Sequence, residues 1–278
     1  MLEQLVPDQW IKDALAEDIG EGDKTTLSTI DPEIQGQGRF LAKQNITVCG
    51  INLAQRVFML LDPHVSVIFT AHDGDRIEQG QVFGTVSGSV HALLQGERTA
   101  LNILQRLSGI ATLTHHYVES IANTQTRILD TRKTLPHYRA LEKYAVRCGG
   151  GNNHRMGLDD QMMIKDNHIT ANGGDVALTV QKAKATYPET YLVVEIADIE
   201  QIEPAIVSGA DRLLLDNMNL QQIQACQERI DGRVPIEVSG GITQAQLPVL
   251  AASAVDFISI GAITHSAVAV DISMKISL

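Results

Sequence analysis

Short apolar runs recur at a regular interval in the second half of the chain, and each run ends in a polar residue or a glycine. The end positions are Glu195, Asp216, Ser239 and Gly261, which are separated by 21, 23 and 22 residues. A buried strand, a turn and an amphipathic helix together take up this length of chain. Since strands joined through helices run parallel to one another, the repeat predicts a parallel sheet covered by helices.

Two earlier apolar runs extend the repeat toward the N-terminus. One ends at Asp130, just before Arg132 and Lys133, and the other ends at Lys165. The sequence therefore predicts six strands, with room for a seventh near residues 147–153. We expect this part of the chain to form an incomplete parallel α/β barrel, whose strand carboxyl ends carry the chemistry.

The first third of the chain has shorter elements and more turns. Strand-like runs cover Gly38–Ala42, Val65–Phe69 and Val82–Val86, and apolar residues at helical spacing cover Leu53–Leu61. A longer helical stripe then extends from about residue 93 to 121. This mixture of elements is typical of a small α+β unit.

The two patterns predict two domains in an α/β protein. Residues 1–108 are expected to form an N-terminal α+β sandwich-like domain, with the C-terminal tail 268–278 packing on it. Residues 109–267 are expected to form the catalytic barrel. A hydrophobic content of 44% is enough for a core in each domain, and 4% aromatic residues imply that these cores are mostly aliphatic.

Composition excludes several classes of protein. With 22 basic and 33 acidic residues, the net charge of −11 argues against a nucleic-acid or membrane-surface role. No apolar run is long enough to span a membrane, and no secretion signal precedes the first domain. The cysteines, Cys49, Cys148 and Cys226, form no CxxC pair or zinc pattern. We therefore expect a cytoplasmic protein with reduced thiols.

One segment reverses the acidic balance of the chain. Residues 132–155 hold six Lys or Arg and one Glu, a local net charge of +5. Arg132 and Lys133 directly follow a strand, and glycines precede His154 and Arg155. Arginine forks suit planar carboxylates, whereas lysine is a compact partner for phosphates. The segment therefore predicts a site for a small polyanion, although Arg132 and Lys133 alone would also fit a solvated turn.

Lysines and arginines recur every four residues in the middle of this segment, at Arg139, Lys143 and Arg147. Like charges at this helical spacing repel one another by a few tenths of a kcal/mol. They could line an anion site, but we assign all three to a face exposed to water or to a partner subunit.

Lys165 ends an apolar run and follows the same segment. Its position permits two roles, a Schiff-base lysine or a permanent cation for substrate binding. Nothing in the neighbouring sequence decides between them.

Two glycine-containing loops follow the last two predicted strands. Ser239 and Gly240 stand in the first loop and Gly261 in the second. Each loop alone fits a tight turn, but a pair after the last strands of an α/β barrel is a recurring phosphate site. We therefore favour phosphate binding.

Glu195 and Asp216 are carboxylates at the ends of neighbouring strands. Buried carboxylates need cations or hydroxyl groups as partners. Mg²⁺ held partly through water, or sugar hydroxyls, would fit them. The alternative is a structural ion pair with Lys133 or Lys165, and we favour the functional interpretation because barrel chemistry lies at this end.

Longer motifs resemble quinolinate phosphoribosyltransferases over nearly the whole chain. They are 17-EDIG-20, 95-QGERTALN-102, 130-DTRKTLP-136, 141-LEKYAV-146, 149-GGGNNHR-155, 164-IKDNH-168, 239-SGG-241 and 261-GAITHS-266. A match this long and ordered is more specific than any single motif.

The resemblance implies a reaction and a set of residue roles. Quinolinate and phosphoribosyl pyrophosphate would give nicotinate mononucleotide, pyrophosphate and CO₂ with Mg²⁺, in the de novo synthesis of NAD. It also implies a homodimer with shared active sites, in some members within a hexamer. By position, the quinolinate carboxylates would be held by Arg98 (from the neighbouring subunit), Arg132, His154, Arg155 and Lys165. The sugar donor would be held by Lys133 (pyrophosphate end), Glu195 and Asp216 (ribose hydroxyls and Mg²⁺), and Ser239, Gly240 and Gly261 (5′-phosphate).

Three other functions stay open at this point. A nicotinate phosphoribosyltransferase would bind one carboxylate and so need fewer cations. An aldolase-like barrel would use Lys165 as its Schiff base. A non-catalytic phosphate-binding module would need only the glycine loops.

Overall fold

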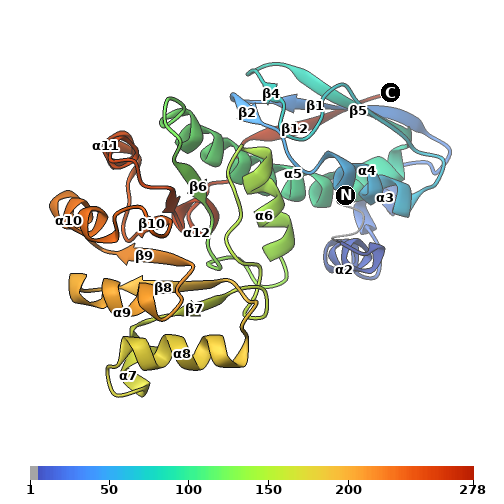
Figure 1. Ribbon diagram of the computed structural model, residues 1–278. Coiled ribbons are helices and arrows are strands. Elements are labelled where there is room, and N and C mark those ends of the chain that lie inside the picture. The colour runs from blue at the N-terminus through green and yellow to red at the C-terminus, as the bar shows by residue number, and fades with distance from the viewer. Residues whose placement is uncertain (1–5) are drawn as a thin grey trace. The chain divides into compact units, whose positions relative to one another are not determined.

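The computed structural model describes residues 6–278, which divide into two compact units (Figure 1). The first unit contains the residues up to 115 together with 135–150 and 263–278. The second unit contains residues 116–134 and 151–262.

The first unit is built on a four-stranded antiparallel sheet with the strand order β12-β1-β5-β3. Its strands are β1 (Gln35–Ala42), β3 (Ser66–Phe69), β5 (Val82–Ser89) and β12 (Ile272–Ser277). A separate two-stranded sheet joins β2 (Ile46–Thr47) to β4 (Arg76–Ile77). The C-terminal strand β12 pairs with β1, so the last strand of the chain joins a sheet whose other strands lie within residues 35–89.

Helices complete the first unit. They are α2 (Asp8–Ile19), α3 (Lys24–Thr29), α4 (Ile51–Leu61), most of α5 (Val90–Glu119) and α6 (Arg139–Cys148). Phe40, Phe58 and Phe83 are fully buried, and the Phe40 ring centroid lies 6.2 Å from that of Phe58 and 6.3 Å from that of Phe83. Burying each of these phenylalanine side chains stabilises the folded protein by about 2 kcal/mol. Three of the five phenylalanines therefore lie in this core.

The second unit holds a six-stranded parallel sheet with the order β6-β11-β10-β9-β8-β7. Its strands are β6 (Arg127–Leu129), β7 (Met162–Ile164), β8 (Leu192–Ile196), β9 (Arg212–Asp216), β10 (Ile236–Ser239) and β11 (Phe257–Ser259). The last strand, β11, pairs with the first, β6, and the ring is open between β6 and β7. This is the predicted incomplete barrel, and the predicted fold class is confirmed.

The seventh strand expected near residues 147–153 is a single bridge in this structure. Asn152 forms a parallel bridge with Leu129, while Arg147 and Cys148 end helix α6. Three consecutive glycines separate the helix from the bridge, and glycine weakens a strand because it has no side chain to pack.

Helices alternate with the strands along the second unit (Figure 1). They are α7 (Asp166–Ala171), α8 (Val176–Thr186), η1 (Ile199–Gln201), α9 (Ile202–Val207), α10 (Leu220–Ile230), η2 (Gln244–Gln246) and α11 (Leu247–Ala252), followed by α12 (Ala262–His265) at the boundary between the units. Across the described residues, no helix combines the length and the apolar character that a membrane span requires.

Helix α6 packs with the first unit, which includes residues 135–150. We expected Lys143 on this helix to face water or a partner subunit, and this was wrong, because Lys143 is 1% exposed beside the fully buried Glu142. Glu142 accepts from the guanidinium of Arg106 at 2.6 Å. Charge spacing identifies a helix face, but the packing partners decide whether that face is buried.

Candidate active site

The strand register of the second unit brings the predicted carboxylates onto one face of the sheet. Glu195 pairs with Leu214, and Asp216 pairs with Ser239 on the next strand. Paired residues of parallel strands share a face, and so do alternate residues of one strand. The side chains of Glu195, Asp216 and Ser239 therefore project from the same face at the carboxyl edge of the sheet, where Lys165 follows β7.

Lys165 and Glu195 form an ion pair at this edge. The Lys165 Nζ lies 3.4 Å from the Glu195 Oε2, and the two side chains are 48% and 16% exposed. Burial raises the pKa of Glu195, the lysine opposes that effect, and the charge of Asp216 adds to it. The structure therefore contains the Lys165–Glu195 ion pair that we considered as the alternative to a functional role for Glu195. Both side chains are partly exposed, so solvent and ligands can reach them.

Two arginines of the basic segment, Arg132 and Arg155, belong to the second unit and repel each other electrostatically. Arg155 is 7% exposed, and its Nη1 donates to the carbonyl oxygen of Gln161 at 2.9 Å. Burial lowers the pKa of Arg155, the charge of Arg132 lowers it further, and Asp160 opposes both. Repulsion between two guanidinium groups is relieved when an anion binds between them. Lys133 follows in the same loop and is exposed.

His154 is held between two buried carboxylates. Asp130, which is fully buried, accepts the backbone N–H of His154 at 2.8 Å and the side-chain amide of Asn153 at 2.5 Å. The His154 Nε2 lies 3.4 Å from the Oε1 of Glu237. These contacts fix the position of the loop that carries Arg155.

Glu237 is a buried carboxylate beside His154 that the sequence did not identify. It is fully buried on β10, where its Oε2 accepts from the Arg212 Nη1 at 3.0 Å and its Oε1 accepts from the Ser259 hydroxyl. Burial raises its pKa, but the contacts with His154, Ser259 and Arg212 outweigh burial, and its pKa lies below the ordinary value. The sequence does contain a signal for Glu237, because it is the one charged residue in strand β10.

The substitution Glu237→Gln is expected to lower the free energy of unfolding by about 3 kcal/mol at pH 7, because it leaves the Arg212 guanidinium without its buried carboxylate partner. Since the pKa of Glu237 lies below its ordinary 4.5 when folded, the ionised carboxylate stabilises the protein fully above that value. This contribution is lost as the pH falls through the folded-state pKa. Urea unfolding should therefore show a wild-type advantage that shrinks below about pH 4.

Glu203→Gln is the matched control, because the Glu203–Arg233 pair at 2.9 Å is exposed. Its removal should change stability little at any pH. An equal effect of both substitutions, or a wild-type advantage that grows in acid, would contradict the role of Glu237.

The loop after β10 contains one glycine with no room for a side chain. Gly240 has φ +106°, and a Cβ there would lie 2.3 Å from the Asn217 Oδ1 and 2.6 Å from the Asn217 backbone nitrogen. Asn217 itself has φ +55° and donates its backbone N–H to Ser239 at 2.9 Å. The loops after β9 and β10 are therefore in tight contact. Gly261 is the second residue after the end of β11 and is half-buried.

The second unit thus contains ten of the eleven predicted site residues: Lys133, Glu195, Asp216, Arg132, His154, Arg155, Lys165, Ser239, Gly240 and Gly261. The remaining residue, Arg98, belongs to the first unit, where it is exposed on α5.

Comparisons with known proteins identify the family of the chain. The sequence profile of the quinolinate phosphoribosyl transferase C-terminal domain matches residues 110–275, and that of the N-terminal domain matches residues 23–108. The chain is 41% identical over 276 residues to the probable nicotinate-nucleotide pyrophosphorylase [carboxylating] of Synechocystis, covering 98% of this chain and 93% of that protein. It is 42% identical over 262 residues to the Bacillus subtilis protein of the same name, covering 94% and 90%.

A solved structure has the same fold. The crystal structure of NadC from Streptococcus pyogenes superposes with a TM-score of 0.94 at 41% identity, covering 97% of this chain and 96% of that one. Both family profiles, these relatives and this structure agree, so the chain belongs to the quinolinate phosphoribosyltransferase family.

Proposed function

We propose that this chain transfers the phosphoribosyl group of phosphoribosyl pyrophosphate to quinolinate, giving nicotinate mononucleotide, pyrophosphate and CO₂ in the synthesis of NAD. The observation that carries this proposal is the gathering of cations and carboxylates in the second unit. Lys165 pairs with Glu195 at the sheet edge that also holds Asp216, and Arg132 and the buried Arg155 lie in the same unit. Two arginines there fit a ligand with two carboxylates.

Quinolinate and the sugar donor are both anions, and each would bind its own set of residues. Arg132, Arg155, His154 and Lys165 would bind the carboxylates of quinolinate. Lys133 would bind the pyrophosphate end of the donor. The 5′-phosphate would be held by Ser239, Gly240 and Gly261. Neutralising both anions in one site brings the reacting atoms together, which lowers the entropic part of the barrier.

In the reaction, the ring nitrogen of quinolinate attacks C1 of the ribose as pyrophosphate leaves. The half-buried carboxylates of Glu195 and Asp216 would stabilise the positive charge that develops on the sugar ring. The pyridinium nitrogen then carries a positive charge, which stabilises the carbanion left at C2 when CO₂ departs, and a proton from solvent completes the C2–H bond of the product. This sequence needs no covalent bond to the enzyme, so Lys165 binds substrate.

Mg²⁺ is the expected cofactor, and the donor atoms present fit it. The pKa of Glu195 is raised by burial and by the neighbouring Asp216, so a divalent cation would relieve the repulsion between the two carboxylates. Mg²⁺ is commonly held by one or two carboxylates together with water and substrate phosphates. When bound, it would neutralise charge on the departing pyrophosphate.

The test is the simultaneous release of CO₂ and pyrophosphate when quinolinate, phosphoribosyl pyrophosphate and Mg²⁺ are supplied together. Neither product should form when one substrate is omitted. Nicotinate, which has a single carboxylate, is the matched control and should turn over at least about a hundredfold more slowly, since an unfilled arginine site remains. Faster turnover of nicotinate would overturn the proposal, and release of pyrophosphate without CO₂ would also overturn it.

A homodimer with shared active sites is part of the proposal. The family resemblance assigns Arg98 to the site of the neighbouring subunit, and its exposed position on α5 supports a role toward another chain. The proposal also places the enzyme in the cytoplasm, which is supported by three free cysteines, two of them buried.

Mixing two inactive variants tests the shared site. Arg98→Ala and Lys133→Ala should each abolish most activity, because each removes a cation that binds substrate. After subunit exchange, half of the dimers are mixed and each has one intact site, so about a quarter of wild-type activity should return. Absence of recovery under confirmed exchange would show that Arg98 does not act in the partner's site.

A further inference from the structure

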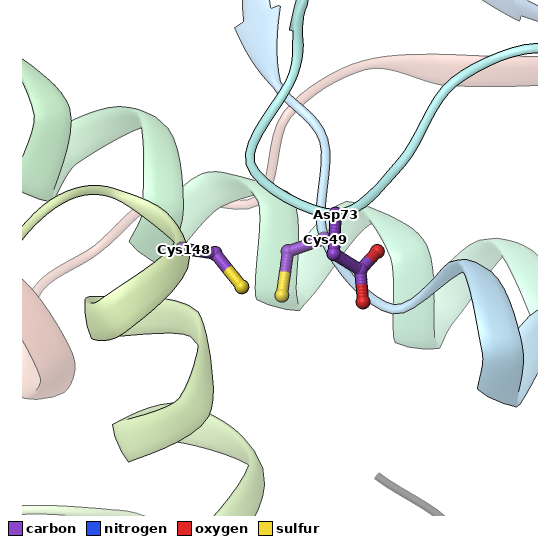
Figure 2. Close-up of side chains that lie close together, drawn as sticks. All are labelled: Cys49, Asp73 and Cys148. Atoms are coloured by element: carbon purple, nitrogen blue, oxygen red, sulfur yellow. The ribbon is translucent and has the colours of Figure 1, made fainter. Parts of the chain in front are cut away.

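Three side chains from distant parts of the sequence meet inside the first unit. Cys49 precedes α4, Asp73 lies in the turn between β3 and β4, and Cys148 is the last residue of α6 (Figure 2). The two sulfur atoms and one carboxylate oxygen all lie within 4.8 Å of one another. Cys49 is fully buried, and the other two residues are half-buried. None of the three has a role in the proposed reaction.

Hydrogen bonds fix the carboxylate of Asp73. Its Oδ1 accepts the backbone N–H groups of Gly50 at 2.9 Å and Ile51 at 3.0 Å, and its Oδ2 accepts the Tyr144 hydroxyl at 2.9 Å. Each carboxylate oxygen has two lone pairs, so Oδ2 keeps one for a further partner. Carboxylates that bind metals are typically oriented by such hydrogen bonds.

The backbone holds both cysteines in place. The Cys49 N–H donates to the Ser108 hydroxyl at 2.9 Å. Cys148 is followed by Gly149, where a Cβ would lie only 2.4 Å from the carbonyl oxygen of Ala111. Because this close approach to α5 requires glycine, the end of α6 and the Cys148 side chain are positioned by packing.

Two thiols and a carboxylate form a donor set with a clear chemical preference. Thiolate ligands select Zn²⁺ over Mg²⁺ or Ca²⁺, which take oxygen ligands. Zinc bonds of about 2.3 Å to sulfur and 2.0 Å to oxygen place neighbouring donors about 3.5–3.8 Å apart in a tetrahedron. Small side-chain rotations would bring the three donors to that spacing.

We propose that Cys49, Asp73 and Cys148 bind one Zn²⁺ ion, with a water molecule as the fourth ligand. Binding converts both thiols to thiolates and releases two protons to solvent. The ion would join α6 to the segments that precede α4 and β4, and so would stabilise the first unit.

Zinc retention tests this site in the full-length protein. Reduced, metal-free protein is mixed with one equivalent of Zn²⁺ under anaerobic conditions, and the zinc that remains after gel filtration is measured. We expect about one zinc per chain in the wild type and less than about a tenth of that in Cys49→Ser and Cys148→Ser. Asp73→Asn should weaken binding at least about tenfold. Cys226→Ser is the matched control, since this buried cysteine lies in the second unit, and it should retain zinc fully.

Co²⁺ gives a second readout that does not depend on stability. The wild type should show the charge-transfer absorption of a thiolate-bound Co²⁺, and the half-buried Cys148→Ser variant should lose most of it even if the fully buried Cys49→Ser variant fails to fold. Equal zinc retention in the wild type and Cys148→Ser would overturn the proposal. It would also be overturned if reduced wild-type protein retained no zinc.

Discussion

Replacing Arg155 with methionine is expected to lower kcat/KM for quinolinate about a thousandfold, with most of the loss in KM. Arg155 is 7% exposed and its guanidinium donates to the Gln161 carbonyl, so the side chain has few alternative positions. Removing one partner of a desolvated charge pair costs about 4 kcal/mol, which corresponds to this factor. Methionine keeps much of the volume of the arginine side chain, so the loss reports on charge and hydrogen bonding rather than on a cavity.

Stability should respond in a different way from activity. The neighbouring charge of Arg132 lowers the pKa of Arg155, so the two cations repel each other in the unliganded protein. Removing one of them should leave the melting temperature unchanged or slightly higher. The KM for phosphoribosyl pyrophosphate should change by less than about threefold, because that substrate binds other residues.

Arg127→Met is the matched control for this experiment. Arg127 is exposed at the start of β6, whereas Arg132 and Arg155 belong to the loops beyond the strand ends. Its substitution should leave kcat/KM nearly unchanged. If Arg155→Met kept near-normal kcat/KM, or lost activity only by unfolding, the arginine pair would not be the quinolinate site.

The position of the carboxylates could be predicted from the sequence because it depends on local periodicity. Glu195 and Asp216 each end an apolar run, and parallel strands must carry such ends to one edge of the sheet. The hydrophobic pattern fixes which residues enter a strand and which face they share. The register then follows from burial of that face.

The partners of buried charges could not be predicted in this way. Glu237 contacts His154, Arg212 and Ser259, which lie 83, 25 and 22 residues away in the sequence. No periodic pattern links these positions, since each contact depends on how separate strands come together. A charge within a buried strand shows that a partner must exist, but it does not identify that partner.

The packing partners of helix α6 could not be predicted from its sequence either. Its sequence predicts a helix with charges on one face, and the structure contains that helix. Its assignment to the first unit depends on packing that no local pattern encodes, including the buried contact between Glu142 and Arg106. The convergence of Cys49, Asp73 and Cys148 likewise depends on this packing.

Gly240→Ala is expected to raise the KM for phosphoribosyl pyrophosphate about a hundredfold, while the KM for quinolinate changes little. The backbone at φ +106° is unfavourable for any residue with a Cβ, and the added carbon would lie 2.6 Å from the Asn217 backbone nitrogen. A backbone atom cannot move aside as a flexible side chain can, so the loops after β9 and β10 must separate. If this loop binds the 5′-phosphate, the loss of about 3 kcal/mol appears as weaker binding of the sugar donor.

Gly241→Ala separates the effect of this close approach from the effect of a left-handed backbone. Gly241 has φ +57°, and a Cβ there would have no atom within 4 Å. The substitution carries a conformational cost of about 1 kcal/mol without a clash, so the KM for the donor should rise no more than about fivefold. Steady-state kinetics with each substrate varied in turn would measure both values. Equal donor KM values for the two variants would show that contact with Asn217 does not shape a phosphate site, because only Gly240 makes that contact.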